Sequence, residues 1–167
     1  IAFILVFAVN AKLSAQAVGD YVATTSGDYN TAANWSVSNG SGGFTGTAAS
    51  APTTSINIWI PEGKIMTTAA QANAQNMSIS GELNCGNYTV QLGTSASTTA
   101  GNLTITSTGK LRSANATGGT VSSLNIYGNA ITIDGQLGAA TATNTTAYNA
   151  TTNPNGGGGF RVYCLAV

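Results

Sequence analysis

The sequence contains little charge and no histidine. Only 6% of its 167 residues are charged, and the five basic and five acidic side chains cancel. A nucleic-acid-binding surface needs clustered cations opposite the phosphates, and the basic residues are too few and too scattered to form one: Lys12, Lys64, Lys110, Arg112 and Arg161. Without histidine and without a G-x-S-x-G motif, a Ser-His-Asp triad is excluded.

Residues that favour helices are also scarce, whereas Thr, Asn and the 21 glycines are abundant. The composition therefore predicts an all-β protein, with one short helical turn conceivable over residues 69–76. Short runs of alternating apolar and polar residues predict strands with one buried face. These runs are residues 56–60, 77–79, 88–92, 103–105, 124–126, 131–133 and 160–164.

A repeated pattern links several of these runs. Apolar-x-apolar is followed by a glycine and, two residues later, another apolar residue, as in Met77-Ser-Ile79-Ser-Gly81-Glu-Leu83. Copies begin at Leu103 and Ile131, and a looser copy with Gly63 and Ile65 begins at Ile58, so the steps are 19, 26 and 28 residues. A unit of this size predicts a β-solenoid, whose turns bury apolar rows against one another, and the glycine suits a tight corner.

The predicted rows contain the apolar residues of these strands, and we expect them to be buried about 4.8 Å apart. They are Ile58, Ile60, Met77, Ile79, Leu83, Val90, Leu92, Leu103, Ile105, Leu111, Leu124, Ile126, Ile131, Ile133 and Leu137.

The segments N-L-T-I (residues 102–105), N-M-S-I (76–79) and G-E-L-N-C-G-N-Y-T-V (81–90) resemble secreted bacterial surface proteins with a right-handed parallel β-helix. Residues 27–35, followed by 51–52 and 56–63, resemble the entry segment of such proteins. The resemblance spans about residues 19–137. It implies an all-β parallel β-helix of four to five rungs with an amino-terminal cap and an adhesive or structural role, although some β-helices degrade polysaccharides.

The amino terminus resembles a secretory signal. Residues 1–9 are all apolar, and Ala15 and Ala17 form an A-x-A site with cleavage before Val18, although no Met or basic residue precedes the apolar run. The run has about half of the ~20 residues that cross a bilayer, so we expect no membrane span. The alternative is a retained strand donated to a neighbouring subunit. Either way, we expect a secreted, extracellular or cell-surface protein.

The expected organisation has five segments. Residues 1–17 are the signal peptide or retained strand, 18–55 an amino-terminal cap, 56–138 the solenoid rungs, 139–159 a Thr/Asn/Gly-rich loop and 160–167 a terminal strand. Cys85 and Cys164 have no metal-binding spacing; they either pair or are two buried apolar side chains. We expect no cofactor and no metal.

The acidic residues do not form a catalytic pattern. Glu82 and Asp134 flank equivalent corner glycines from opposite sides, which places them on opposite faces of the strand rather than in a glycosidase pair. A β-helix lyase would combine an acidic cluster for calcium with a basic residue. Lys110 and Arg112 lie near each other, but no such cluster accompanies them in the sequence. We therefore expect no enzymatic activity and solvated charges at these positions.

Aromatic residues offer one alternative function. Trp35 and Trp59, with Tyr21, Tyr29 and Phe44, could stack on sugars. The other interpretation is that Trp35 and Phe44 close the first rung, with Trp59 packed beside it.

No segment that resembles a cap follows the carboxyl-terminal strand, so we expect this strand to pair with a continuation of the chain or with another subunit. A head-to-tail contact that does not close produces a filament. The candidate subunit contacts are Phe160, Val162, Tyr163, Leu165, Val167, Ile4 and Val6. The sequence thus predicts a non-enzymatic extracellular structural or adhesive protein that forms a homo-oligomer or filament. The alternative is a domain of a larger surface protein that binds surface glycans or degrades polysaccharides.

Overall fold

The computed structural model describes residues 16–94, 100–113, 122–128, 130–139 and 160–165. Within this part of the chain the fold is all-β, with one short 3-10 turn, η1 (Ala32–Asn34), and three sheets. No helix among these residues has the length and apolar character needed to cross a membrane.

The seven-stranded sheet has the order β14-β11-β8-β5-β1-β3-β4. Its strands are β1 (Tyr21–Ala23), β3 (Trp35–Ser38), β4 (Phe44–Thr47), β5 (Ile58–Ile60), β8 (Met77–Ile79), β11 (Leu103–Ile105) and β14 (Ile131–Ile133). All pairings are parallel except those of β3, which is antiparallel to both β1 and β4.

The other two sheets are entirely parallel. The five-stranded sheet, in the order β15-β12-β9-β6-β2, contains β2 (Gly27–Asp28), β6 (Ile65–Thr67), β9 (Glu82–Asn84), β12 (Lys110–Ser113) and β15 (Gln136–Ala139). The four-stranded sheet, in the order β16-β13-β10-β7, contains β7 (Ala72–Ala74), β10 (Val90–Leu92), β13 (Ser122–Tyr127) and β16 (Phe160–Leu165).

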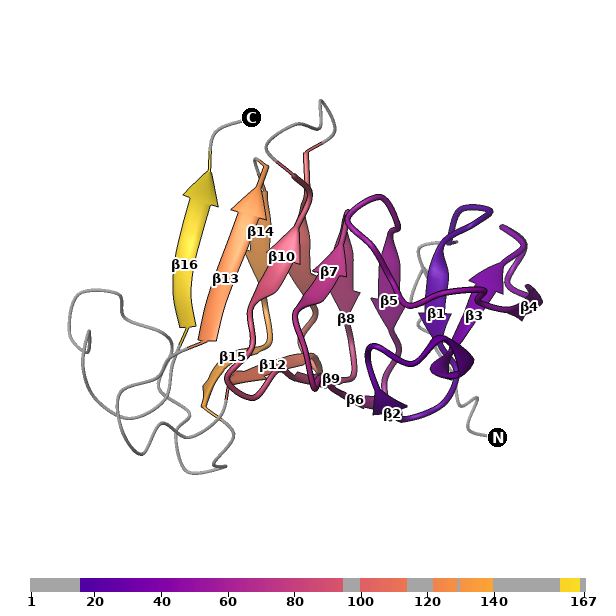
Figure 1. Cartoon of the computed structure of the whole chain (residues 1–167), viewed down its shortest axis with the longest axis horizontal. Helices are drawn as coiled ribbons and strands as arrows, with labels where there is room; N and C mark the ends of the chain where they lie inside the picture. Colours follow the sequence, from indigo (N-terminus) through magenta and orange to yellow (C-terminus); the bar gives the residue numbers. More distant parts are fainter. Residues whose placement is uncertain (1–15, 95–99, 114–121, 129, 140–159, 166–167) are drawn as a thin grey trace, which may run out of the picture.

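From β5 onward the chain visits the three sheets in a fixed order, and we call one such passage a circuit. The four circuits are β5–β7, β8–β10, β11–β13 and β14–β16. In Figure 1 the seven- and four-stranded sheets stand upright, one behind the other, and the five-stranded sheet runs along the bottom. The circuits follow one another from β5 toward β16 at one end of the molecule, and β4 lies at the other.

The predicted repeat is confirmed in the strand register. Met77 is the Cα partner of both Ile58 and Leu103, and Leu103 also pairs with Ile131. The apolar side chains of the first three circuits therefore align in rows, and every predicted core residue from Ile58 to Ile126 is at most 2% exposed. Leu137, in the fourth circuit, is 9% exposed.

Two predicted core residues, Ile131 and Ile133, are exposed instead, at 36% and 42%. They lie on β14, which ends its sheet. An apolar row buries its side chains between the layers on both sides, and no strand that the structure describes follows β14 in this sheet. The burial prediction is therefore wrong for Ile131 and Ile133, whereas Leu137 in the same circuit is buried as predicted.

The looser first copy of the repeat is shifted by one residue. Met66, not Ile65, is the Cα partner of Leu83 and is fully buried, whereas Ile65 is half-exposed. Because strand side chains alternate between faces, one additional residue at the turn moves Ile65 to the outer face. Gly63 has a φ of +77° in that turn, a conformation that favours glycine.

The glycines of the other three copies are required by close backbone approach rather than by positive φ. A Cβ at Gly81 would collide with the carbonyl oxygens of Pro61 and Lys64, and one at Gly109 with the carbonyl oxygen of Ile79. At Gly135 the colliding groups are the carbonyls of the preceding circuit. Each glycine therefore lets its corner pack directly onto the corner of the circuit before it.

The short helical turn considered for residues 69–76 does not form. Ala72 and Ala74 instead lie on strand β7, fully buried, as the Cα partners of Val90 and Leu92. Pairing with β10 outweighs the helical preference of alanine, because tertiary packing overrides a weak local propensity in so short a segment.

A column of asparagines precedes the strands of the seven-stranded sheet. Asn76 donates from Nδ2 to Oδ1 of Asn57 at 2.7 Å and accepts at its own Oδ1 from the backbone N–H of Asn102 at 2.8 Å. Asn57 in turn donates to Oδ1 of Asp20 at 3.0 Å. The column gives the asparagine of the N-M-S-I segment a structural role, whereas Asn102 of the N-L-T-I segment takes part through its backbone N–H. Ala130 holds the equivalent position in the fourth circuit.

Candidate functional site

The end of the molecule at β14, β15 and β16 exposes part of the apolar core. Leu103 and Ile105 are 1% and 0% exposed, whereas their Cα partners Ile131 and Ile133 are 36% and 42% exposed. In the part of the chain that the structure describes, β14, β15 and β16 are each the last strand at this end of their sheet. Outermost strands have a row of backbone N–H and C=O groups that can pair with another chain.

The predicted terminal strand forms as β16, the outermost strand of its sheet. It pairs in parallel with β13 along its whole length, from Ser122 opposite Phe160 to Tyr127 opposite Leu165. The backbone of the candidate contacts Phe160, Val162, Tyr163 and Leu165 therefore lies at the sheet edge, as Figure 1 shows. The remaining candidates, Ile4, Val6 and Val167, lie outside the described residues.

The opposite end is filled by aromatic side chains. Trp35 and Tyr29 are fully buried, and their rings meet edge to face with centroids 5.1 Å apart. The Trp35 indole N–H donates to the Tyr29 carbonyl at 2.8 Å, and the Tyr29 hydroxyl donates to the Asn73 carbonyl at 2.7 Å. Burial raises the pKa of Tyr29 far above its ordinary value, because the charged phenolate would lose its hydration.

Burial excludes Trp35 from sugar stacking, so that prediction is wrong for this residue. A stacking platform must present an open ring face, and Trp35 has no exposed surface. Phe44, expected to close the same end with it, is 50% exposed on β4, whose residues are all exposed.

Trp59 lies on the outer face of the seven-stranded sheet. It lies in the middle of β5 with Val22 and Ser78 as its Cα partners, and it is half-buried between the two inward residues Ile58 and Ile60. Its indole N–H donates to the Ser80 hydroxyl at 3.4 Å, which turns the ring edge toward the corner that leads into the five-stranded sheet.

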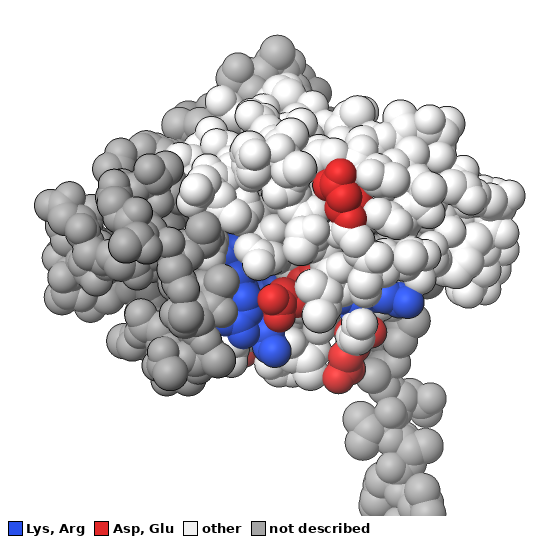
Figure 2. All heavy atoms as spheres, turned by 60° about the horizontal axis from the view of Figure 1, so that its bottom comes forward, with Lys and Arg blue, Asp and Glu red and all other residues white. Residues whose placement is uncertain are grey.

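The charged side chains gather on one face. Apart from Asp20, every charged residue whose side chain is described lies on the five-stranded sheet or in a turn that leads into it: Asp28, Glu62, Lys64, Glu82, Lys110, Arg112 and Asp134. Figure 2 shows blue and red side chains gathered on this face. The central outward positions of the other two sheets carry uncharged residues instead, such as Thr104 and Gln91.

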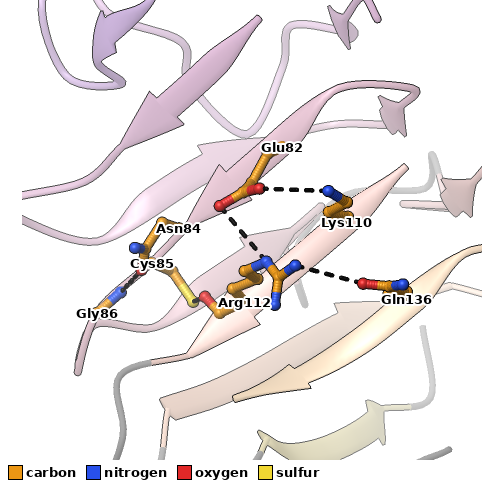
Figure 3. A network of polar contacts seen from close by, with 7 residues as sticks. All are labelled: Glu82, Asn84, Cys85, Gly86, Lys110, Arg112 and Gln136. Atoms are coloured by element: carbon orange, nitrogen blue, oxygen red, sulfur yellow. Dashed lines mark hydrogen bonds and ion pairs between the residues drawn. The ribbon is translucent and has the colours of Figure 1, made fainter. Parts of the chain in front are cut away.

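Glu82 is the centre of a small network on this face (Figure 3). Its carboxylate forms ion pairs with Arg112 Nε at 3.4 Å and with Lys110 Nζ at 4.0 Å, and Arg112 also donates to Gln136 Oε1 at 3.3 Å. Arg112, whose side chain is only 14% exposed, is therefore not the solvated cation that was predicted, whereas Lys110, directly opposite Glu82 in the register, is 41% exposed. The 28-residue separation of Glu82 and Lys110 could have been found by aligning the glycines of the repeat.

Beneath this network the thiol of Cys85 donates to the Arg112 carbonyl at 3.0 Å (Figure 3). Cys85 is fully buried, in agreement with the interpretation of a buried apolar side chain. The side chain of Cys164 lies outside the described part of the chain.

A groove of about 250 Å³ lies beside the network, at the corner between the seven- and five-stranded sheets. It is lined by Glu62, Gly63, Lys64, Ile65, Ser80, Gly81, Glu82, Thr108 and Lys110. The groove thus combines both signs of charge with two hydroxyl groups and the half-exposed Ile65.

The acidic residues do not converge on a catalytic or metal-binding arrangement. Glu82 lies on β9 in the second circuit and Asp134 in the turn before β15 in the fourth, and β12 separates β9 from β15. Among the described residues, no three Asp, Glu, Cys or His side chains are grouped so that they could hold a metal ion.

Comparison with known proteins returned no match: no family model, no curated protein and no solved structure is significantly similar to the chain.

Proposed function

We propose that the chain is an exported, non-enzymatic structural or adhesive protein, built as a parallel β-solenoid that self-associates through its ends. Each circuit corresponds to one rung of the solenoid, and residues 18–55 form the amino-terminal cap. The observation that carries the proposal is the exposure of Ile131 and Ile133 at the end of rows that are otherwise buried.

Two features of the seven-stranded sheet support a head-to-tail contact. Its end strands, β14 and β4, contain neither proline nor charge, the usual devices that protect a sheet edge from pairing with another chain. In addition, β4 runs in the same direction as β14, because two antiparallel pairings separate it from β1. A second copy could therefore extend the sheet with the prevailing strand direction.

Sedimentation velocity over a range of concentrations tests the proposal. The wild-type chain should form species larger than a monomer, and Ile133→Lys should abolish them, because an ammonium group would be placed in the contact. The matched control is Thr132→Lys, on the outer face of the same strand. A wild-type chain that stays monomeric at every concentration would refute the self-association.

A further inference from the structure

The groove at the corner between the seven- and five-stranded sheets combines groups suited to a hydroxyl-rich anion. We propose that it binds an acidic polysaccharide, with Lys64 and Lys110 pairing with the carboxylate or sulfate groups of the ligand. The proposal assigns the glycan-binding alternative, which the sequence left open, to this groove and to acidic polysaccharides. It does not depend on self-association.

The two lysines provide positive charge that the protein neutralises only in part. Lys64 forms no ion pair with another described residue, and Lys110 lies 4.0 Å from Glu82, at the outer limit for an ion pair. Glu82 is held more closely by Arg112, at 3.4 Å. The carboxylate of Glu82 is therefore shared between two cations, which leaves Lys110 available to an anion in the groove.

The other lining groups match the uncharged parts of a sugar chain. Glu62 is exposed at the groove and can accept hydrogen bonds from sugar hydroxyls, as can the Ser80 hydroxyl. Ile65 is 51% exposed and offers an apolar contact to a ring face. Trp59 approaches the same corner through its hydrogen bond to Ser80, so an aromatic ring lies beside the groove.

The balance of charge favours a polysaccharide over other anions. Nucleic acids and anionic membranes are bound by dense positive charge, whereas this face alternates bases with Glu62 and Glu82. The groove presents the hydroxyl groups of Ser80 and Thr108 beside charges of both signs. Such a surface suits a sugar polymer whose acidic groups are separated by hydroxyl groups.

The test measures binding of polygalacturonate to the intact chain by isothermal titration calorimetry, beside dextran sulfate and fully methyl-esterified polygalacturonate. We expect both acidic polymers, or one of them, to bind and the neutral ester not to bind. The double variant Lys64→Gln/Lys110→Gln should weaken binding by about fivefold or more, the effect of two partly exposed ion pairs, whereas Lys64→Arg/Lys110→Arg should retain it.

A second variant separates charge from structural damage. Glu62→Gln removes a negative charge from the same groove but keeps an amide oxygen that can accept hydrogen bonds, so it should strengthen the binding of acidic polymers. Equal affinity for the neutral ester, unchanged affinity in Lys64→Gln/Lys110→Gln, or binding only to anionic lipid vesicles would each overturn the proposal. Sedimentation of the same variants reports self-association separately, so failure of one proposal does not imply failure of the other.

Discussion

Ile105 and Ile133 are Cα partners in adjacent parallel strands, yet Ile105 is fully buried and Ile133 is 42% exposed. The two residues are chemically identical and occupy the same row. Among the described strands, one more layer follows Ile105 and none follows Ile133, so comparing the two positions measures how much the next layer stabilises an isoleucine in this row.

Replacing Ile105 with Ala should lower the free energy of unfolding by about 2–5 kcal/mol, through lost apolar contact and the cavity that remains. Ile133→Ala should cost less than half as much in the dispersed chain, because that side chain is already partly in water. Denaturant unfolding at low protein concentration measures both. Equal losses at the two positions would contradict the open end described above.

Gly109→Ala should destabilise the chain by about 1–3 kcal/mol, because the new methyl group collides with the Ile79 carbonyl oxygen and forces the corner apart. Gly138→Ala is the control, since a Cβ there meets no atom within 4 Å. We expect it to change stability by less than about 0.5 kcal/mol. Thermal unfolding distinguishes the two, and a tolerated Gly109→Ala would show that the corners are not closely packed.

Asn76→Ala should cost about 1–3 kcal/mol, because it removes a side chain that both donates to Asn57 and accepts from the backbone of Asn102. Asn87, exposed in the turn before β10, provides the comparison, and its alanine variant should be nearly neutral. If urea unfolding finds the two variants equally stable, the hydrogen bonds of the asparagine column do not contribute to the stability of the folded chain.

Stability should fall at alkaline pH through Tyr29. Its pKa is raised in the folded chain by burial, whereas in the unfolded chain it ionises near its ordinary value of 10.0. The stability that the protonated Tyr29 gives the folded chain is therefore fully present below pH 10.0. It decreases as pH rises above this value, because only the unfolded state then releases the proton. Tyr29→Phe should reduce this slope in unfolding experiments between pH 9 and 11, a range about one unit either side of the ordinary tyrosine pKa. An unchanged slope would mean that other groups cause it.

No hydrolysis or elimination of polysaccharides is expected, since Glu82 is held by two cations and Asp134 lies two circuits away. Assays of reducing ends and of unsaturated products should give the same background for the wild type, Glu82→Gln and Asp134→Asn. Turnover that disappears in either variant would refute the non-enzymatic interpretation.

The repeat was predictable because register in a parallel sheet follows the apolar spacing, as the partners Ile58, Met77 and Leu103 show. The charged network was harder to predict from the sequence. Glu82 and Lys110 are found to lie opposite each other only when the copies of the repeat are aligned at their glycines. The buried position of Trp35 and the strand at Ala72–Ala74 could not be derived from local pattern, because both depend on packing against distant residues.

Electron microscopy of the purified chain tests the central claim most directly. If the exposed ends bind one another, negatively stained samples should contain unbranched filaments or sheets, and Ile133→Lys should disperse them while Thr132→Lys does not. Isolated particles of the size of one chain in the wild-type sample, at every concentration imaged, would contradict the account.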